Sequence, residues 1–303
     1  DPGIMSMWRA VVTCACRAHA RPGSRRASTM ALYEIEGKGR ALVAERAISA
    51  GSTLLQCTPI AKVLKSTSDV TACERCLGPL PSASRFCSQL CALEHADHGG
   101  ELLQRCDLRA LHAIHEEQGR KFPLMVAQLL ASLLAGLKQT GTAPLVWQHA
   151  LALCHAVIPD EGMPQVEEEH RALVTAFVAA GISDDSSLKL LLPLSRYTQL
   201  LGAAQLNAFE LHTTRGHTIS CLLPSSASCF NHSCEPNTHV SCSETHEVSF
   251  VTARDVGAGE ELVISYAALD LGYEERQRIF QYKYAFECQC PRCQREAAGT
   301  VSE

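Results

Sequence analysis

The sequence has no long apolar run of the kind that crosses a lipid bilayer. Its longest uncharged stretches are 122–137 and 139–159. The first falls short of the ~20 apolar residues that a spanning helix needs, and the second is interrupted by glutamine, histidine and proline. Both are predicted to be buried helices, and we expect no contact with a membrane.

An excess of charge of one sign is also missing. The chain carries 27 lysines and arginines against 32 aspartates and glutamates, a net charge of −5. Because nonspecific binding of nucleic acid depends on a clear positive excess, we expect no direct nucleic-acid binding. With 46% hydrophobic and 19% charged residues among 303, the composition is typical of a globular chain of about two domains.

Aromatic residues are few, at 5%, but cysteine is abundant, with 16 in the chain. There is no plain secretory signal, since the apolar run 5–15 is interrupted by Ser6 and Arg9. Chains that depend on disulfide frameworks are also usually much shorter. We therefore expect an intracellular protein with reduced cysteines. Two tight cysteine groups favour metal ligation over free buried thiols.

The N-terminal segment 1–30 differs from the rest of the chain. It is rich in arginine and serine and contains a single acidic residue, Asp1. This composition is typical of an organellar transit peptide. The alternatives are a disordered tail or a later translation start at Met5, Met7 or Met30. The predicted location is the nucleus or cytoplasm, or an organelle if this segment is a transit peptide.

The remaining chain alternates between two patterns. The first part shows β patterning, and turn-forming residues 49–52 between 41–44 and 53–56 suit a hairpin. From 107 to 202 the apolar spacing is helical, and after Ala203 the β patterning returns. We predict an α+β chain in which a helical block splits one β domain.

The first cysteine group has metal-ligand spacing. Cys73 and Cys76 are separated by two residues, and Cys87 and Cys91 by three. Two such pairs can close a tetrahedral zinc site, which stabilises a segment too small for a core of its own.

The motif at 86–91 resembles the MYND zinc finger. That finger normally holds two zinc ions, but its middle cysteine pair is absent from this sequence. We therefore carry over only the first zinc. His98 and Cys106 are expected to be ordinary surface or helix residues.

The second group, Cys288, Cys290 and Cys293, supplies three thiolates and needs a fourth ligand. Cys234 is the candidate because it lies in a turn-prone segment with no cysteine partner nearby. A zinc ion shared by the four would hold the C-terminal segment over this turn. The residues that it would gather are Asn231, His232, Tyr266, Tyr284 and Phe286.

In this order, the motifs resemble those of a SET-domain methyltransferase. Asn-His-Ser-Cys at 231–234 together with Cys-x-Cys-x2-Cys at 288–293 is highly specific, whereas Gly-x-Gly at 37–39 alone is weak. The finger makes the chain similar to the SET-and-MYND group of lysine methyltransferases, and the likeness covers roughly 31–295. The better-known members also carry a C-terminal helical-repeat domain. Since this sequence stops at Glu303, their substrates are not carried over.

The resemblance implies a binding site for S-adenosylmethionine. Gly37 and Gly39 would let the backbone approach the methionine end of the cofactor, where a Cβ would collide. Phe286 would lie against the adenine. The residues that the resemblance assigns to cofactor binding are Gly37, Gly39, Arg40, Asn207, Asn231, His232 and Phe286.

The resemblance also implies a narrow channel for a lysine side chain. Methyl transfer from a sulfonium needs little covalent help, so the protein must align the lysine nitrogen and present it neutral. A free lysine has a pKa of about 10.4, and desolvation beside the sulfonium lowers it. Tyr266 and Tyr284 are predicted to form this channel and to orient the amine through their hydroxyls.

The predicted function is S-adenosylmethionine-dependent N-methylation of lysine in a protein or peptide, histone or non-histone, by a monomer with two zinc ions. The competing hypothesis is a non-catalytic adaptor whose finger binds partner proteins. A small-molecule or redox zinc protein would leave the glycines and tyrosines unexplained.

The predicted fold is a β-rich SET fold interrupted by a zinc-finger insert and a helical insert. The predicted segments are the tail or transit peptide at 1–30, the N-terminal SET part at 31–70, the finger at 71–106, the helical insert at 107–202, the C-terminal SET core at 203–268, a zinc-binding post-SET cap at 269–295 and a tail at 296–303.

Overall fold

The computed structural model describes residues 29–64, 73–75, 80, 84–118, 122–212, 218–243 and 247–300. Nearly all of the predicted 1–30 segment, and the predicted ligand Cys76, lie outside the described residues. The mixed helix and strand content confirms the α+β prediction.

The strands are β1 (Met30–Ile35), β2 (Gly39–Ala44), β3 (Thr53–Cys57), β4 (Ala61–Leu64), β5 (Ala208–His212), β6 (Thr218–Leu222), β7 (Asn231–His232), β8 (Thr238–Cys242), β9 (Val248–Thr252) and β10 (Val263–Ile264). The helices are α1 (Gln89–Asp97), α2 (Gly100–Arg105), α3 (Arg109–Gln118), α4 (Phe122–Thr140), α5 (Leu145–Leu151), α6 (Met163–Ala179), α7 (Asp185–Leu191), α8 (Leu194–Asn207), α9 (Tyr273–Ile279) and α10 (Pro291–Thr300), with a π-helical turn at Phe280–Tyr284.

Short sheets built from distant segments make up the β region. β1 pairs with β2, β9 lies between β3 and β8, and β6 lies between β4 and β5, all antiparallel. β7 and β10 form a parallel pair that places Asn231 beside Val263. The buried rings of Phe230 and Phe250 stack in the core between these strands, with centroids 4.5 Å apart.

The predicted hairpin between 41–44 and 53–56 is wrong. β2 pairs with β1, whereas β3 pairs with β9 far along the chain. The intervening turn is docked on the end of β9, because the Gly51 N–H donates to the Thr252 carbonyl (2.9 Å) and the Ser52 N–H donates to the Thr252 hydroxyl (2.9 Å). A distant strand therefore replaces the local partner.

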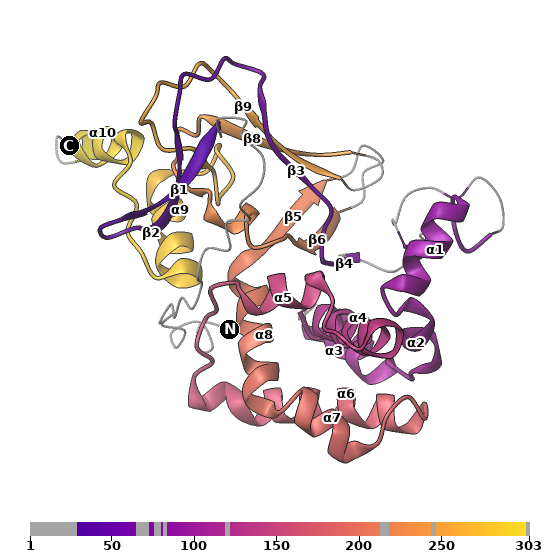
Figure 1. Ribbon diagram of the computed structural model, residues 1–303. Helices are drawn as coiled ribbons and strands as arrows, with labels where there is room; N and C mark the ends of the chain where they lie inside the picture. Colours follow the sequence, from indigo (N-terminus) through magenta and orange to yellow (C-terminus); the bar gives the residue numbers. More distant parts are fainter. Residues whose placement is uncertain are drawn as a thin grey trace.

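Helix α4 forms the core of a helical lobe. Figure 1 shows α2 to α8 gathered on one side of the strands, with α9 and α10 away from this group. α4 is long and apolar enough to cross a membrane by length and composition, but 67% of its most apolar window is buried inside the structure. Leu129 and Leu130 are fully buried. A helix that is apolar on all sides is typical of a protein core, as the sequence predicted.

Close contacts hold α4 against the strands and α8 against a neighbouring loop of the helical lobe. Gln128 of α4 accepts from the Lys62 N–H (2.9 Å) and donates to the Lys62 carbonyl (2.7 Å), which covers the outer edge of β4. Gly202 of α8 lies against Ala156, whose N–H donates to the Gly202 carbonyl (3.2 Å). A Cβ on Gly202 would lie 2.1 Å from the Ala156 carbonyl oxygen. This glycine therefore sets how closely the loop after α5 approaches α8.

We expect Gly202→Ala to lower the free energy of unfolding by about 1–3 kcal/mol, because the added methyl must displace the backbone around Ala156. Thermal unfolding measures this loss. Gly257→Ala is the matched control, since a Cβ there has its nearest neighbour, Glu260 Oε2, at 4.0 Å. Equal losses in the two variants would contradict the close packing of α8.

Candidate active site and metal centres

A quartet of cysteines joins the turn after β7 to the start of α10. The Sγ atoms of Cys234, Cys288, Cys290 and Cys293 all lie within 4.8 Å of one another. Cys234 Sγ is 3.5 Å from Cys293 Sγ and 4.0 Å from Cys288 Sγ. A tetrahedral zinc ion with Zn–S bonds of about 2.3 Å needs sulfurs about 3.8 Å apart. The quartet therefore fits a structural zinc ion.

The protonation chemistry of the quartet agrees with this fit. Burial raises the pKa of the Cys234 and Cys288 thiols, to about 12 for Cys288. Burial acts on Cys290 in the same direction, but the backbone N–H groups of Cys293 and Cys234 and the neighbouring thiols lower its pKa to about 7. Buried thiolates repel one another, so four of them are stable together only around a cation.

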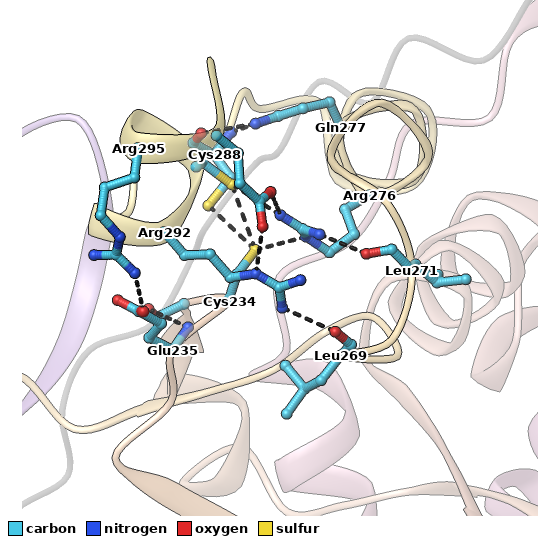
Figure 2. Close-up of polar contacts among 12 residues, drawn as sticks. Cys234, Glu235, Leu269, Leu271, Arg276, Gln277, Cys288, Arg292 and Arg295 are labelled. Atoms are coloured by element: carbon cyan, nitrogen blue, oxygen red, sulfur yellow. Dashed lines mark hydrogen bonds and ion pairs between the residues drawn. The ribbon is translucent and has the colours of Figure 1, made fainter. Parts of the chain in front are cut away.

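Two side chains fasten α9 to the quartet, as Figure 2 shows. Gln277 donates from Nε2 to the Cys288 carbonyl (2.8 Å) and accepts from the Cys288 N–H (2.9 Å). The fully buried Arg276 donates from Nε to Cys234 Sγ (3.3 Å) and from Nη2 to Cys293 Sγ (3.8 Å). The segment between Gln277 and Cys288 is therefore held at both ends.

This segment carries two of the predicted aromatic site residues. The π-helical turn ends at Tyr284, and Ala285 follows with a φ of 56°, in the left-handed region that non-glycine residues rarely adopt. The ring of Phe286 stacks on the buried Phe280, with centroids 5.3 Å apart and planes 12° apart. Tyr284 meets Tyr266, with ring centroids 4.8 Å apart. The turn thus places Tyr284 and Phe286 beside the cysteine quartet.

His232 links the quartet to Tyr266. Its Nδ1 accepts from the Tyr266 N–H (3.0 Å), so Nε2 carries the proton and donates to Cys234 Sγ (3.2 Å). Burial and the nearby charge of Arg276 lower the pKa of His232 to about 4, so the ring is neutral near pH 7. Its ring lies 4.2 Å from that of Phe280. Because both nitrogens bond within the protein, its predicted contact with a cofactor rests on its backbone groups.

The two predicted catalytic tyrosines differ in how their hydroxyls are used. The Tyr266 hydroxyl donates to the Phe230 carbonyl (2.7 Å). Burial, and then the neighbouring Tyr284, raise the pKa of Tyr266, so it stays protonated. Within the described residues, the contacts of Tyr284 involve its ring, including the Lys283 ammonium 5.1 Å from its centroid. No hydrogen-bond partner of the Tyr284 hydroxyl lies among these residues.

Asn231 is held by its side-chain amide. Nδ2 donates to the Arg40 carbonyl (3.0 Å) and to Glu261 Oε1 (2.9 Å). Glu261 also forms an ion pair with Lys38 in the turn between β1 and β2. One carboxylate, which the sequence analysis did not single out, therefore positions both the glycine turn and the asparagine.

Gly37 and Gly39 lie on either side of Lys38 with positive φ angles of 75° and 71°. A Cβ at either position would meet no protein atom within 4 Å. The backbone conformation therefore favours glycine here, and packing within the protein does not require it. The open space beside the turn fits the predicted approach of a cofactor.

Cys154, also missed by the sequence analysis, connects Arg40 to Asn207. Arg40 Nη2 donates to Cys154 Sγ (3.0 Å), and Asn207 Nδ2 donates to the carbonyls of Cys154 (2.7 Å) and Ala203 (2.8 Å). Asn207 is the last residue of α8, where the chain enters β5. The loop after α5 therefore brings together predicted cofactor residues from distant segments. No local motif around Cys154 signals this contact.

The finger segment contains the second cysteine group. The Sγ atoms of Cys73, Cys87 and Cys91 lie within 4.8 Å of one another, with 3.5 Å between Cys87 and Cys91. Ser88 caps α1 by accepting from the Cys91 N–H (3.2 Å), which fixes the short Cys87–Cys91 turn. These three thiols fit a zinc site whose predicted fourth ligand, Cys76, lies outside the described residues.

His98 and Cys106 have other partners. His98 Nδ1 donates to the Glu94 carbonyl (2.8 Å), and the Cys106 thiol donates to the Leu102 carbonyl (3.3 Å). Neither residue belongs to a group of potential metal ligands among the described residues.

The chain is similar to known proteins. The SET domain family model matches residues 39–267. Histone-lysine N-methyltransferase ATXR4 of Arabidopsis thaliana is 28% identical over 86% of this chain and 84% of the relative. A SET and MYND domain-containing protein of Dictyostelium discoideum is 22% identical over 86% of this chain and 81% of the relative. Protein-lysine N-trimethyltransferase SMYD5 of Mus musculus is 46% identical over 23% of this chain and 18% of the relative.

We expect two zinc ions per chain, measured by elemental analysis of the purified protein. Cys290→Ser should lose one of them and unfold at a lower temperature, because a structural zinc site contributes directly to folding. Cys106→Ser is the matched control and should keep both ions. A third zinc ion, or metal loss in Cys106→Ser, would contradict these assignments.

Proposed function

Because the chain belongs to the SET domain family, we propose that it is an S-adenosylmethionine-dependent protein-lysine N-methyltransferase. The observation that carries the proposal is the pair of tyrosines beside the cysteine quartet. Tyr284 presents a hydroxyl with no partner among the described residues, 4.8 Å ring to ring from the partly buried Tyr266. A polar group of this kind beside an aromatic wall suits a ligand that is positioned by hydrogen bonds.

The predicted cofactor residues fit S-adenosylmethionine, whose sulfonium supplies an activated methyl group. The open turn at Gly37 and Gly39 allows a close approach to the backbone. Asn231 uses its amide nitrogen within the protein, which leaves its oxygen as an acceptor for the cofactor. The residues proposed to hold the cofactor are Gly37, Gly39, Arg40, Asn207, Asn231, His232 through its backbone, and Phe286.

The substrate lysine would enter between Tyr266 and Tyr284. The Tyr266 hydroxyl donates to the Phe230 carbonyl, so its oxygen can accept one N–H of the amine. The Tyr284 hydroxyl can hold the amine from a second direction, and together the two would fix where the nitrogen lone pair points. Apolar ring surface disfavours the ammonium form, and the neutral ring of His232 does not reverse this.

The proposed substrate is a lysine in a protein or peptide, since two of the relatives are named for histone-lysine or protein-lysine methylation. The proposed substrates include both histone and non-histone proteins. The proposed location is intracellular, in the nucleus or cytoplasm or in an organelle. A monomer is proposed, without nucleic-acid or membrane binding.

We expect Tyr284→Phe to reduce methyl transfer about 10²–10³-fold, or to change the number of methyl groups added, because the deleted hydroxyl orients the amine. Affinity for S-adenosylmethionine and the zinc content should not change, since the ring is retained. Single-turnover methylation, with labelled cofactor and a substrate found in a proteome extract by mass spectrometry, measures the rate. Calorimetry measures cofactor binding.

Tyr282→Phe is the matched control, because Tyr282 lies two residues away with half of its surface exposed (50%). It should retain the wild-type rate. Equal rates for wild type and Tyr284→Phe would overturn the role of Tyr284. The adaptor hypothesis predicts instead that the wild type transfers no methyl group to any protein in the extract.

A further inference from the structure

Arg276 is a buried cation without an equally buried carboxylate. Its residue exposure is 0%, and it ranks among the largest fully buried side chains. Its acidic partner is Glu296, which is 34% exposed in its side chain and is shared with Arg292 (2.8 Å). A buried charge is costly unless it is well compensated. The environment of Arg276 must therefore supply further negative charge.

Two donor nitrogens of Arg276 face the cysteine quartet. Nη1 donates to the Leu271 carbonyl, while Nε lies 3.3 Å from Cys234 Sγ and Nη2 lies 3.8 Å from Cys293 Sγ. Figure 2 shows the guanidinium of Arg276 between Cys234 and Leu271. Four thiolates around one divalent ion carry a net charge of −2, which a neighbouring cation compensates. The arginine and the loaded metal centre are electrostatically complementary.

We propose that Arg276 is a positioning residue of the C-terminal zinc centre, where its guanidinium donates hydrogen bonds to the Cys234 and Cys293 thiolates and offsets their charge. The planar fork of arginine can reach two sulfurs and a carboxylate at once, which a lysine ammonium on a flexible stem cannot do. Hydrogen bonds to charged acceptors are also the stronger class. This inference concerns the metal centre and does not depend on methyl transfer.

Arg276 would act on the aromatic site through the metal centre. Together with Gln277 it ties α9 to the quartet, and the segment from Gln277 to Cys288 carries Tyr284 and Phe286. Loss of Arg276 would therefore remove one of the two side chains that tie α9 to the quartet, as well as weaken the metal site.

The test compares Arg276→Met, which keeps the length without the charge, with Arg276→Lys, which keeps the charge without the fork. Arg278→Gln is the matched control on the same helix, because the Arg278 side chain is 79% exposed and pairs only with Glu274 among the described residues. The zinc-loaded full chain is exposed to a chelator and an alkylating reagent. Peptide mass spectrometry then follows the alkylation rate of each cysteine.

In Arg276→Met we expect alkylation of the quartet to accelerate about tenfold or more. Cys73, Cys87 and Cys91 of the finger serve as the internal reference and should react at the wild-type rate. Arg276→Lys should give an intermediate rate, and Arg278→Gln the wild-type rate. In the cobalt-loaded protein, the thiolate-to-metal charge-transfer bands should move to lower energy in both Arg276 variants, since unbonded thiolates are easier to oxidise.

Equal quartet rates in wild type and Arg276→Met would overturn the proposal. So would a matching acceleration at the finger cysteines, because that would indicate general loosening of the chain. If Arg276→Met does not fold, Arg276→Lys decides alone. A faster quartet with shifted cobalt bands supports the role, and wild-type values in both measurements refute it.

Discussion

The sulfur atoms of the cysteine quartet join segments that are 54 residues apart in sequence, counted from Cys234 to Cys288. Most of the aromatic site depends on this junction. The His232 ring is oriented by its bond to Cys234, and the Tyr266 backbone is in turn bound to His232. In addition, the Gln277 side chain forms two hydrogen bonds with the Cys288 backbone, which limits where the π-helical turn can lie. A metal centre here would therefore position residues that are not themselves metal ligands.

The chemical identity of the site was predictable from the sequence because ligand type and spacing are local properties. Three thiols within six positions require a fourth, and few segments could provide it. The contacts that position the site were not predictable in the same way. No local sequence pattern distinguishes Arg276, Glu261 or Cys154. Their roles follow from contacts with residues that are distant in sequence. The same reason explains the wrong hairpin prediction. The residues of the turn suited a hairpin, but the turn instead forms hydrogen bonds with the distant Thr252.

Strain is concentrated where the two aromatic site residues flank Ala285. A left-handed alanine costs of order 1 kcal/mol, and a π-helical turn is itself uncommon. The stacked rings of Phe280 and Phe286 and the Gln277 contacts hold this conformation against its cost. The direction of Tyr284 is therefore set by tertiary contacts, which helix propensity alone would not produce.

The pairing of β4 and β5 on opposite edges of β6 has a consequence for how the molecule could be shortened. Both strands run antiparallel to β6, so they are parallel to each other. A chain leaving β4 at Leu64 must travel back along the whole strand before it can enter β5 at Ala208. Parallel strands cannot be joined by a tight turn and need a crossover of about a dozen residues or more. A minimal version of this protein could exchange its helices for another bridge, but it could not do without one.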